Sequence, residues 1–221
     1  MTKEEYSPEK LAEKYNIDLE KLKKEQEKLA KQIILKDERD FLNTRIAGVY
    51  SVFDKNKIIS AVVLLDEEME VLEQTYFQDK VSFPYISGFR AYRELPSLVS
   101  AIGKLDEKPG LILVNAHGIA HERLGMASHL SLSTGIPTIG IANKLLAGKI
   151  KKGDIILNKK KVGKEFISRE NARPLYISPG NMVSLKTSSE IVEKLTIYPH
   201  KLPEPLHIVM RYAKKIRKEL G

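Results

Sequence analysis

The sequence predicts an α/β protein in which a mixed sheet is flanked by helices. Three strand-like stretches follow one another closely between residues 45 and 78, which is typical of an antiparallel meander. After residue 84, helical periodicity alternates with short, wholly apolar stretches, as expected for strands that are covered on both faces. A chain of 221 residues is long enough for a sizeable core, so we expect one domain over residues 1–221.

Two helices are expected before the sheet, as a helical extension over residues 1–40 that packs on or beside the domain. Ser7 and Pro8 form a start signal for the first, because a capping serine precedes a proline at the first helical position. Asp18 caps the second, which we expect to run to about Glu38 with an apolar stripe on one face. The simpler interpretation is a packing helix, and the alternative is a helix that binds a partner protein.

The elements of the domain itself follow in order. The three meander strands are expected at residues 45–53, 58–65 and 70–78, with turns at 54–57 and 66–68. Later strands are expected at 111–114, 138–142 and 175–178, the last ending in a turn at 179–181, with a peripheral hairpin over 153–157 and 160–162. Helices are expected over 84–105, before 138, over 188–195 and over 204–220.

The composition excludes several classes of protein. No apolar run approaches the roughly 18 residues of a membrane span, and the charged N-terminus lacks the apolar core of a signal peptide. The chain has no cysteine, which excludes disulfides, thiolate metal sites and a cysteine nucleophile. A cytoplasmic location is the default expectation. The lack of Cys and Trp with abundant Lys, Glu and Ile is typical of a thermophile.

The net charge of +8 is concentrated in the body of the chain. Residues 1–40 carry 10 Lys and Arg against 11 Asp and Glu, whereas residues 144–169 carry 9 basic and 2 acidic residues. Residues 211–219 add 5 basic residues and 1 acidic residue. This pattern favours a polyanionic partner, since each neutralised phosphate releases counterions. A solvated lysine-rich surface is the alternative.

Three segments carry the strongest functional signal: 45–50, 84–94 and 111–121. Together with the sequences Pro137-Thr138-Ile139-Gly140 and Leu202-Pro203-Glu204-Pro205, they resemble endonuclease V, the family that nicks nucleic acid near deoxyinosine. The resemblance covers roughly residues 20–210. It implies a ribonuclease H-like fold, nucleic acid as partner, Mg²⁺ as cofactor and a role in DNA repair.

The resemblance also assigns the metal-binding positions. Two of them, Tyr50 and Asn115, stand where the family has aspartate, and Glu94 keeps the family glutamate. Mg²⁺ prefers charged oxygen ligands and open positions for water and phosphate, where it lowers the pKa of the attacking water. A neutral phenol and a neutral amide are poor substitutes. We therefore expect Mg²⁺ to bind weakly or not at all.

Further catalytic positions are partly altered. His121 matches a family histidine that acts at the water or the phosphate. Asn143 stands where the family has lysine, and Lys144 follows one residue later. Met210 stands where relatives carry an acidic residue or histidine.

Nucleic-acid contacts are expected from two segments. The first, residues 84–87, resembles a wedge segment that separates the two strands beside a lesion by filling the vacated base step. The second is the loop after residue 115, in which a glycine lets backbone amides approach a base or phosphate. The expected contact residues of these segments are Pro84, Tyr85, Ile86, Ser87, Gly88, Ala116, His117 and Gly118, with Lys144 beside them.

Three hypotheses follow. In the first, the chain is a pseudoenzyme that binds DNA or RNA, with or without inosine, and has lost most or all cleavage. In the second, it is a working nuclease in which Asp54, Glu122 or the phosphates supply the missing oxygens. In the third, it is a non-catalytic protein partner, for example of an active paralogue. The sequence leaves the oligomeric state open.

Overall fold

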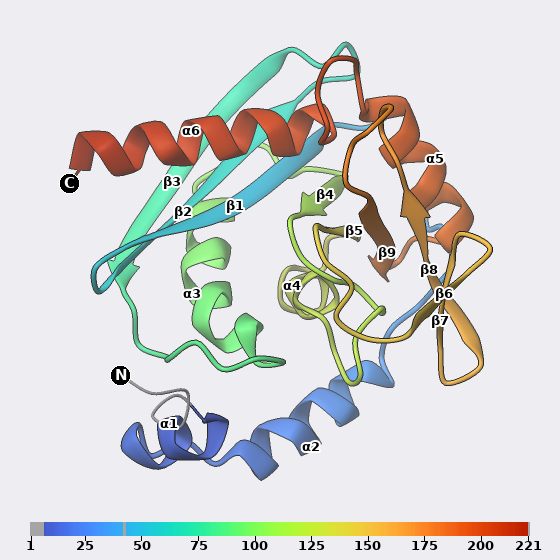
Figure 1. The fold of residues 1–221 in the computed structure, drawn as a ribbon. Coiled ribbons are helices and arrows are strands. Elements are labelled where there is room, and N and C mark those ends of the chain that lie inside the picture. Colours follow the sequence, from blue (N-terminus) through green and yellow to red (C-terminus); the bar gives the residue numbers. More distant parts are fainter. Residues whose placement is uncertain (1–6, 42, 221) are drawn as a thin grey trace.

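The computed structural model describes residues 7–41 and 43–220, and within them nine strands form one mixed sheet (Figure 1). The strand order is β3-β2-β1-β4-β5-β9-β8-β7-β6. Strand β4 pairs in parallel with β1 and with β5, and the other neighbours pair antiparallel. The strands are β1 (Ile46–Asp54), β2 (Lys57–Leu65), β3 (Val71–Lys80), β4 (Leu111–Val114), β5 (Thr138–Ala142), β6 (Lys149–Lys151), β7 (Asp154–Leu157), β8 (Lys160–Phe166) and β9 (Leu175–Asn181).

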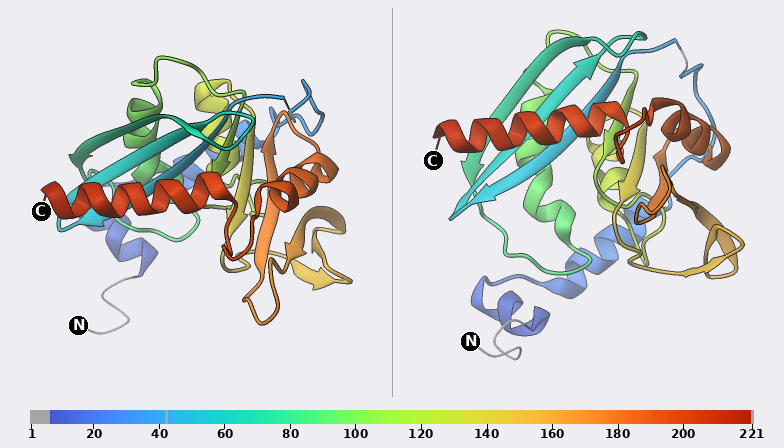
Figure 2. Two further views of the ribbon diagram at one scale, coloured as in Figure 1. Left: turned by 90° about the horizontal axis from the view of Figure 1, so that it is seen from above. Right: turned by 45° about the horizontal axis from the view of Figure 1, so that its top comes forward.

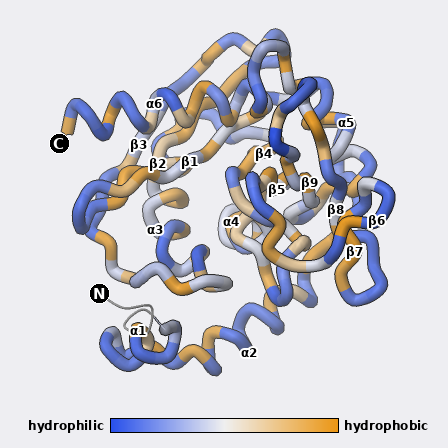
Figure 3. The backbone as a smooth tube through the Cα atoms, in the orientation of Figure 1, coloured by the Kyte–Doolittle hydropathy of each residue, from blue (hydrophilic) through white to orange (hydrophobic). Residues whose placement is uncertain are grey.

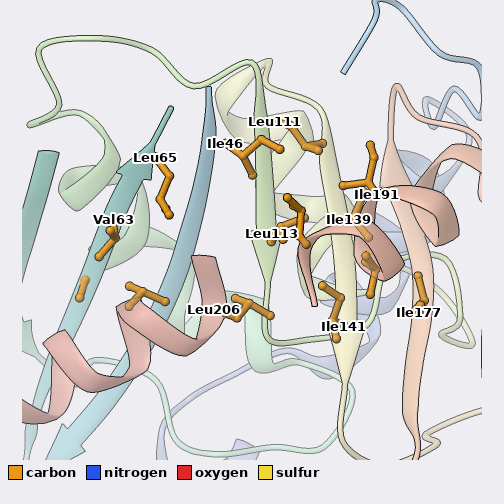
Figure 4. Packing of buried hydrophobic residues seen from close by; sticks show 14 of the residues in the cluster. Ile46, Val63, Leu65, Leu111, Leu113, Ile139, Ile141, Ile177, Ile191 and Leu206 are labelled. Carbon is orange, nitrogen blue, oxygen red and sulfur yellow. The ribbon is translucent and has the colours of Figure 1, made fainter. Parts of the chain in front are cut away.

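Helices cover both faces of the sheet, as the sequence predicted (Figures 1 and 2). On one face α5 and α6 pack on a large apolar cluster, in which Leu206 lies beside Leu113 and Ile141 (Figure 4). On the other face α3 and α4 pack on a second cluster. The helices are α1 (Pro8–Lys14), α2 (Leu19–Ala30), α3 (Arg90–Ile102), α4 (Met126–Thr134), α5 (Leu185–Leu195) and α6 (Glu204–Leu220).

Side chains along β1 alternate between the two faces of the sheet. Ile46 and Tyr50 pack on the cluster beneath α6, whereas Ala47 and Val49 pack on the cluster beneath α3. Gly48 lies between them, and a Cβ atom there would come within 2.0 Å of the carbonyl oxygen of Pro205. Only glycine therefore lets the start of α6 press directly on β1.

The N-terminal helices lie along one side of the domain, and α2 contacts α4 (Figures 1 and 2). Helix α1 starts at the expected cap, Ser7, and α2 starts at Asp18. The expected end of α2 near Glu38 is wrong, because the helix ends at Ala30. Beyond it, Ile34 donates its N–H to the side chain of Asn181, and its carbonyl accepts the N–H of Met182. These contacts with the end of β9 hold the segment in a non-helical conformation.

Two further expectations need correction. Residues 179–181 do not form a turn but continue β9, with a register shift opposite residues 138 and 139. The expected peripheral hairpin is a three-stranded ribbon, β6 to β8, which joins the main sheet through the pairing of β8 with β9. Figure 3 shows that the loops of this ribbon are largely hydrophilic. Among the described residues, no helix combines the length and apolar character needed to cross a membrane.

Candidate functional site

The candidate site lies where β1 extends past the end of β4. Val49 is the partner of Val114, the last residue of β4. Tyr50 and Asn115 are therefore the next residues on adjacent parallel segments. The carboxyl ends of parallel strands are a common place for ligand sites, because loops leave room there. The N-terminal half of α3 brings Arg90 and Glu94 to the same place.

The carboxylate of Glu94 is buried and fully engaged by Arg90. Glu94 is 3% exposed. Arg90 Nε donates to Glu94 Oε1 at 2.5 Å, and Arg90 Nη2 donates to Glu94 Oε2 at 3.0 Å. The two residues are four apart on one helix, the spacing that places side chains on the same face. This fork-like pairing is the strong form of a charge-assisted hydrogen bond.

The same guanidinium also ties α3 to the end of β4. Arg90 Nη1 donates to the backbone carbonyl of Asn115 at 2.8 Å. Burial alone would lower the pKa of Arg90, but the charge and hydrogen bonds of Glu94, with smaller effects of Tyr50 and Tyr85, raise that pKa above its usual value. Arg90 is thus a permanent cation between the three positions that the resemblance assigned to metal.

The two altered aspartate positions differ in their surroundings. Tyr50 is half-buried against the cluster beneath α6, and its hydroxyl group interacts electrostatically with Arg90. The amide nitrogen Nδ2 of Asn115 is buried and has no hydrogen-bond acceptor among the described residues. An unpaired buried donor costs free energy, on the order of 1–3 kcal/mol, so this amide is poised to gain from an acceptor that reaches it.

A cavity of about 410 Å³ opens beside Arg90 and Asn115. Nine of the residues expected from the sequence line it, and Arg90, Leu145 and Leu146 are among those that the sequence did not single out. The nine are Tyr85, Ser87, Gly88, Asn115, Ala116, His117, His121, Asn143 and Lys144. Glu94, Tyr50, Met210, Pro84, Ile86 and Gly118 do not line it.

Both histidines of the cavity are held neutral at pH 7. Burial, with the charge of Arg123 and the proximity of His117, lowers the pKa of His121 to about 4. Burial also lowers the pKa of His117, an effect that nearby Arg90 reinforces, although a hydrogen bond to the carbonyl of Lys144 opposes it. That bond joins His117 Nε2 and the carbonyl oxygen at 2.9 Å, so Nε2 carries the proton, because a carbonyl only accepts.

Glycines press the loop after β4 against its neighbours. A Cβ atom at Gly118 would come within 2.0 Å of the carbonyl oxygen of Pro179, and one at Gly140 would come within 2.4 Å of the Gly118 nitrogen. The N–H of Gly118 is donated to Ser178 Oγ at 2.8 Å. In the structure this amide is therefore committed to the protein, and Gly118 serves close packing rather than an open approach to a ligand.

One large side chain of the wedge segment, that of Tyr85, protrudes into solvent. Tyr85 is 64% exposed, whereas Ile86 is 1% exposed and packed inside. Ser87 and Gly88 lie between this cavity and a second one of about 390 Å³, which α1 and α2 help to line. Tyr85 is thus available to stack on a base, and Ile86 is not.

Met210 and Asn143 are the two remaining altered positions. Met210 is half-buried on α6. Asn143 is exposed after β5, and its Oδ1 accepts a hydrogen bond from Lys201 Nζ at 3.2 Å. The sequence pattern gave no sign that Lys201 reaches Asn143, because Lys201 precedes α6 and is 58 residues away.

The side chains at the end of β4 do not fit a divalent cation. The carboxylate of Glu94 already has both oxygens paired with a guanidinium. Its neighbours offer a phenol and an amide, which are weak ligands for Mg²⁺. Across residues 7–41 and 43–220, no three His, Cys, Asp or Glu side chains gather in a way that could hold a metal ion. The sequence shows an arginine four residues before Glu94, but it did not reveal that this arginine bonds to the end of β4.

The fold defines a protein of the ribonuclease H-like class, with the candidate site at the ends of β1 and β4. A family model described as Endonuclease V matches residues 27–210. The Endonuclease V of Thermosipho melanesiensis is 34% identical in an alignment that covers 96% of this chain and 94% of that protein. The chain therefore belongs to the endonuclease V family, as the resemblance predicted.

Solved structures agree with this assignment. The structure of Endonuclease V from Streptomyces avermitilis has a TM-score of 0.83 and 28% identity, covering 92% of this chain and 94% of that one. The structure of Ciona intestinalis Endonuclease V has a TM-score of 0.81 and 25% identity, covering 92% and 98%. That protein was solved in complex with a 24-mer DNA containing an inosine followed by a ribo-adenosine. The expected ribonuclease H-like fold is confirmed.

Proposed function

We propose that this protein is an endonuclease V homologue that binds nucleic acid and has lost, or severely weakened, metal-dependent cleavage of phosphodiester bonds. The observation that carries the proposal is the pairing of Glu94 with Arg90, next to Tyr50 and Asn115. A nuclease of this kind needs a dication to activate water and to neutralise charge on the phosphate. One buried carboxylate that is already neutralised is a poor place for such an ion.

Binding of nucleic acid is supported independently of cleavage. The cavity is lined by Arg90 and Lys144 and holds two neutral histidines. The exposed lysines of the β6–β8 ribbon extend this positive charge, with Lys149, Lys151, Lys152, Lys159, Lys160 and Lys161 all exposed. The likeness to a relative that was solved with DNA supports the same partner. Phosphate attraction by such a surface does not require a metal.

The second hypothesis, a nuclease with rearranged ligands, gains no support from the geometry. Asp54 is the last residue of β1, four residues beyond Tyr50, and Glu122 is an exposed residue that lines the second cavity. Neither lines the cavity beside Arg90.

The test combines cleavage and binding on the same substrates. Single- and double-stranded DNA and RNA, with and without one inosine, are incubated with the protein in Mg²⁺ or Mn²⁺, and the Thermosipho melanesiensis relative serves as the positive control. We expect a salt-dependent mobility shift and little or no nicking. Nicking that Glu94→Ala abolishes would overturn the loss of cleavage. Unaltered oligonucleotide mobility at low salt would overturn the binding.

A further inference from the structure

Arg90 is the charged side chain that faces both Glu94 and the cavity. Glu94 is almost inaccessible to solvent, whereas the side chain of Arg90 is 34% exposed and lines the cavity. The ion pair is neutral overall, but its positive end points into the open space. A ligand entering the cavity therefore meets a cation at the place where the resemblance assigned metal-binding positions.

The guanidinium has hydrogen-bonding capacity left. Arginine carries five N–H groups. One on each of Nε and Nη2 is donated to Glu94, and one on Nη1 to the Asn115 carbonyl. One N–H on each terminal nitrogen remains without an acceptor among the described residues. Both terminal nitrogens thus keep a donor, which is the requirement for gripping two oxygens of one phosphate.

The surroundings hold this cation in place. Three hydrogen bonds fix the guanidinium, so little side-chain entropy is lost when an anion binds to it. Tyr85 lies within electrostatic reach of Arg90 and is exposed, so a base stacked on its ring would place the adjoining phosphate near the guanidinium. Asn115 Nδ2 is a further donor that lacks an acceptor.

We propose that the Arg90 guanidinium, held by Glu94, takes the electrostatic place of a divalent cation and binds a nucleic-acid phosphate without any metal. This inference rests on the proposed function and specifies how the pocket of that function works. It requires Arg90 and its partner to act as one unit: Glu94 anchors the cation, and the cation contacts the phosphate. Glu94 is thus a positioning residue here.

The experiment measures fluorescence anisotropy of a labelled single-stranded oligonucleotide with one inosine, in EDTA or in Mg²⁺ at matched ionic strength. For the unmodified protein we expect the same dissociation constant in both buffers. We expect Arg90→Leu/Glu94→Leu, which removes the ion pair without leaving a lone buried charge, to weaken binding at least about tenfold in both buffers. The slope of log affinity against log salt should fall by about 0.7, the share of one phosphate contact on a single strand.

Matched variants separate this account from simpler ones. Lys186→Gln removes the charge of an 85% exposed side chain on α5, and both affinity and slope should stay unchanged. Arg90→Lys should keep part of the affinity, because a point charge replaces a planar fork. Binding that EDTA weakens tenfold, or a double variant that binds as tightly and with the same salt slope as the unmodified protein, would overturn the inference while leaving the proposed function intact. Failure of the unmodified protein to bind any oligonucleotide would overturn the proposed function itself, and this inference with it.

Discussion

Lys201 Nζ donates a hydrogen bond to Asn143 Oδ1 at 3.2 Å, and this bond joins the segment before α6 to the loop after β5. Asn143 lines the main cavity. Burial and the nearby charge of Arg173 lower the pKa of Lys201. A lysine from a different part of the chain therefore brings an ammonium group to the position where the resemblance expected a lysine side chain.

Lys201→Met is expected to weaken binding of an inosine-containing oligonucleotide by about three- to tenfold, because one partly exposed cation near the phosphate is lost. Asn143→Lys in the same background should restore most of the affinity. The measurement is anisotropy at low salt, with Lys186→Met, an 85% exposed side chain on α5, as the control. Equal effects of the two methionine variants would contradict a local role for Lys201.

Tyr85→Leu is expected to weaken binding of single-stranded nucleic acid by about 1–3 kcal/mol, the typical contribution of one base stacked on an aromatic ring. Tyr85 is 64% exposed, so its removal should leave stability almost unchanged. Titrations in parallel with Leu72→Ala, an exposed apolar residue on β3, control for a general loss of apolar surface. Unchanged affinity of Tyr85→Leu would remove the wedge segment from the binding surface.

Stability should fall in mild acid through His121. Burial, Arg123 and His117 lower its pKa in the folded state from 6.5 to about 4. Between these values the unfolded chain binds a proton that the folded chain does not, so the contribution of His121 is complete above about pH 6.5 and declines as the pH falls toward 4. The loss is up to about 1.4 kcal/mol for each pH unit in this window.

Urea denaturation at pH 7 and pH 5 measures this effect as a change in the free energy of unfolding. The difference in that change between the unmodified protein and His121→Asn isolates His121 from the other histidines. The variant should lose less stability between the two pH values than the unmodified protein does. An equal loss would show that His121 is not the group that titrates.

Gln26 is a buried polar residue that joins α2 to segments beside the site. It is 0% exposed, donates to the Gly88 carbonyl at 3.0 Å and accepts from Arg123 Nε at 2.8 Å. Gln26→Leu leaves these partners without their hydrogen bonds, and we expect a loss of about 1–3 kcal/mol. In Gln26→Leu, amide hydrogen exchange should speed up more in α2 than in β4, relative to the unmodified protein. Glu27→Leu, an exposed neighbour on α2, is the matched control, and equal exchange in both variants would contradict the anchoring role of Gln26.

The sequence allowed much of the fold to be predicted because its signals are local. The caps at Ser7 and Asp18, the apolar stretch of β4 and the start of α6 at Glu204 all lie where the patterns indicated. Failures came where distant contacts override local preference. The segment after Ala30 is tied to β9. In β9, Pro179 pairs with Ile139 of β5 and Gly180 lies at the register shift, so the chain does not turn there.

In the candidate site, too, local sequence signals were predictive and distant contacts were not. Motifs located Tyr50, Glu94 and Asn115, because each belongs to a recognisable segment. The spacing of four residues allowed the Arg90–Glu94 pair but did not reveal that Arg90 also bonds to Asn115. It gave no sign that Lys201 reaches Asn143, since that contact depends on tertiary geometry. It also could not separate the protruding Tyr85 from the buried Ile86 within one segment.

Restoring the carboxylates offers a direct functional test of the altered positions. Tyr50→Asp/Asn115→Asp should gain little cleavage of inosine-containing DNA in Mg²⁺, because Arg90 still neutralises Glu94. Adding Arg90→Leu should free Glu94 and give clear nicking, which additional Glu94→Ala should abolish. Equal nicking with and without the change at position 90 would contradict the idea that Arg90 blocks a metal.

Calorimetric titration of the unmodified protein with Mg²⁺ tests the central claim most directly, since it asks whether Arg90 has taken the place of the ion. We predict no stoichiometric binding to the unmodified protein, and one bound ion in Tyr50→Asp/Asn115→Asp/Arg90→Leu. Tight one-to-one uptake of Mg²⁺ by the unmodified protein, lost in Glu94→Ala, would contradict the account.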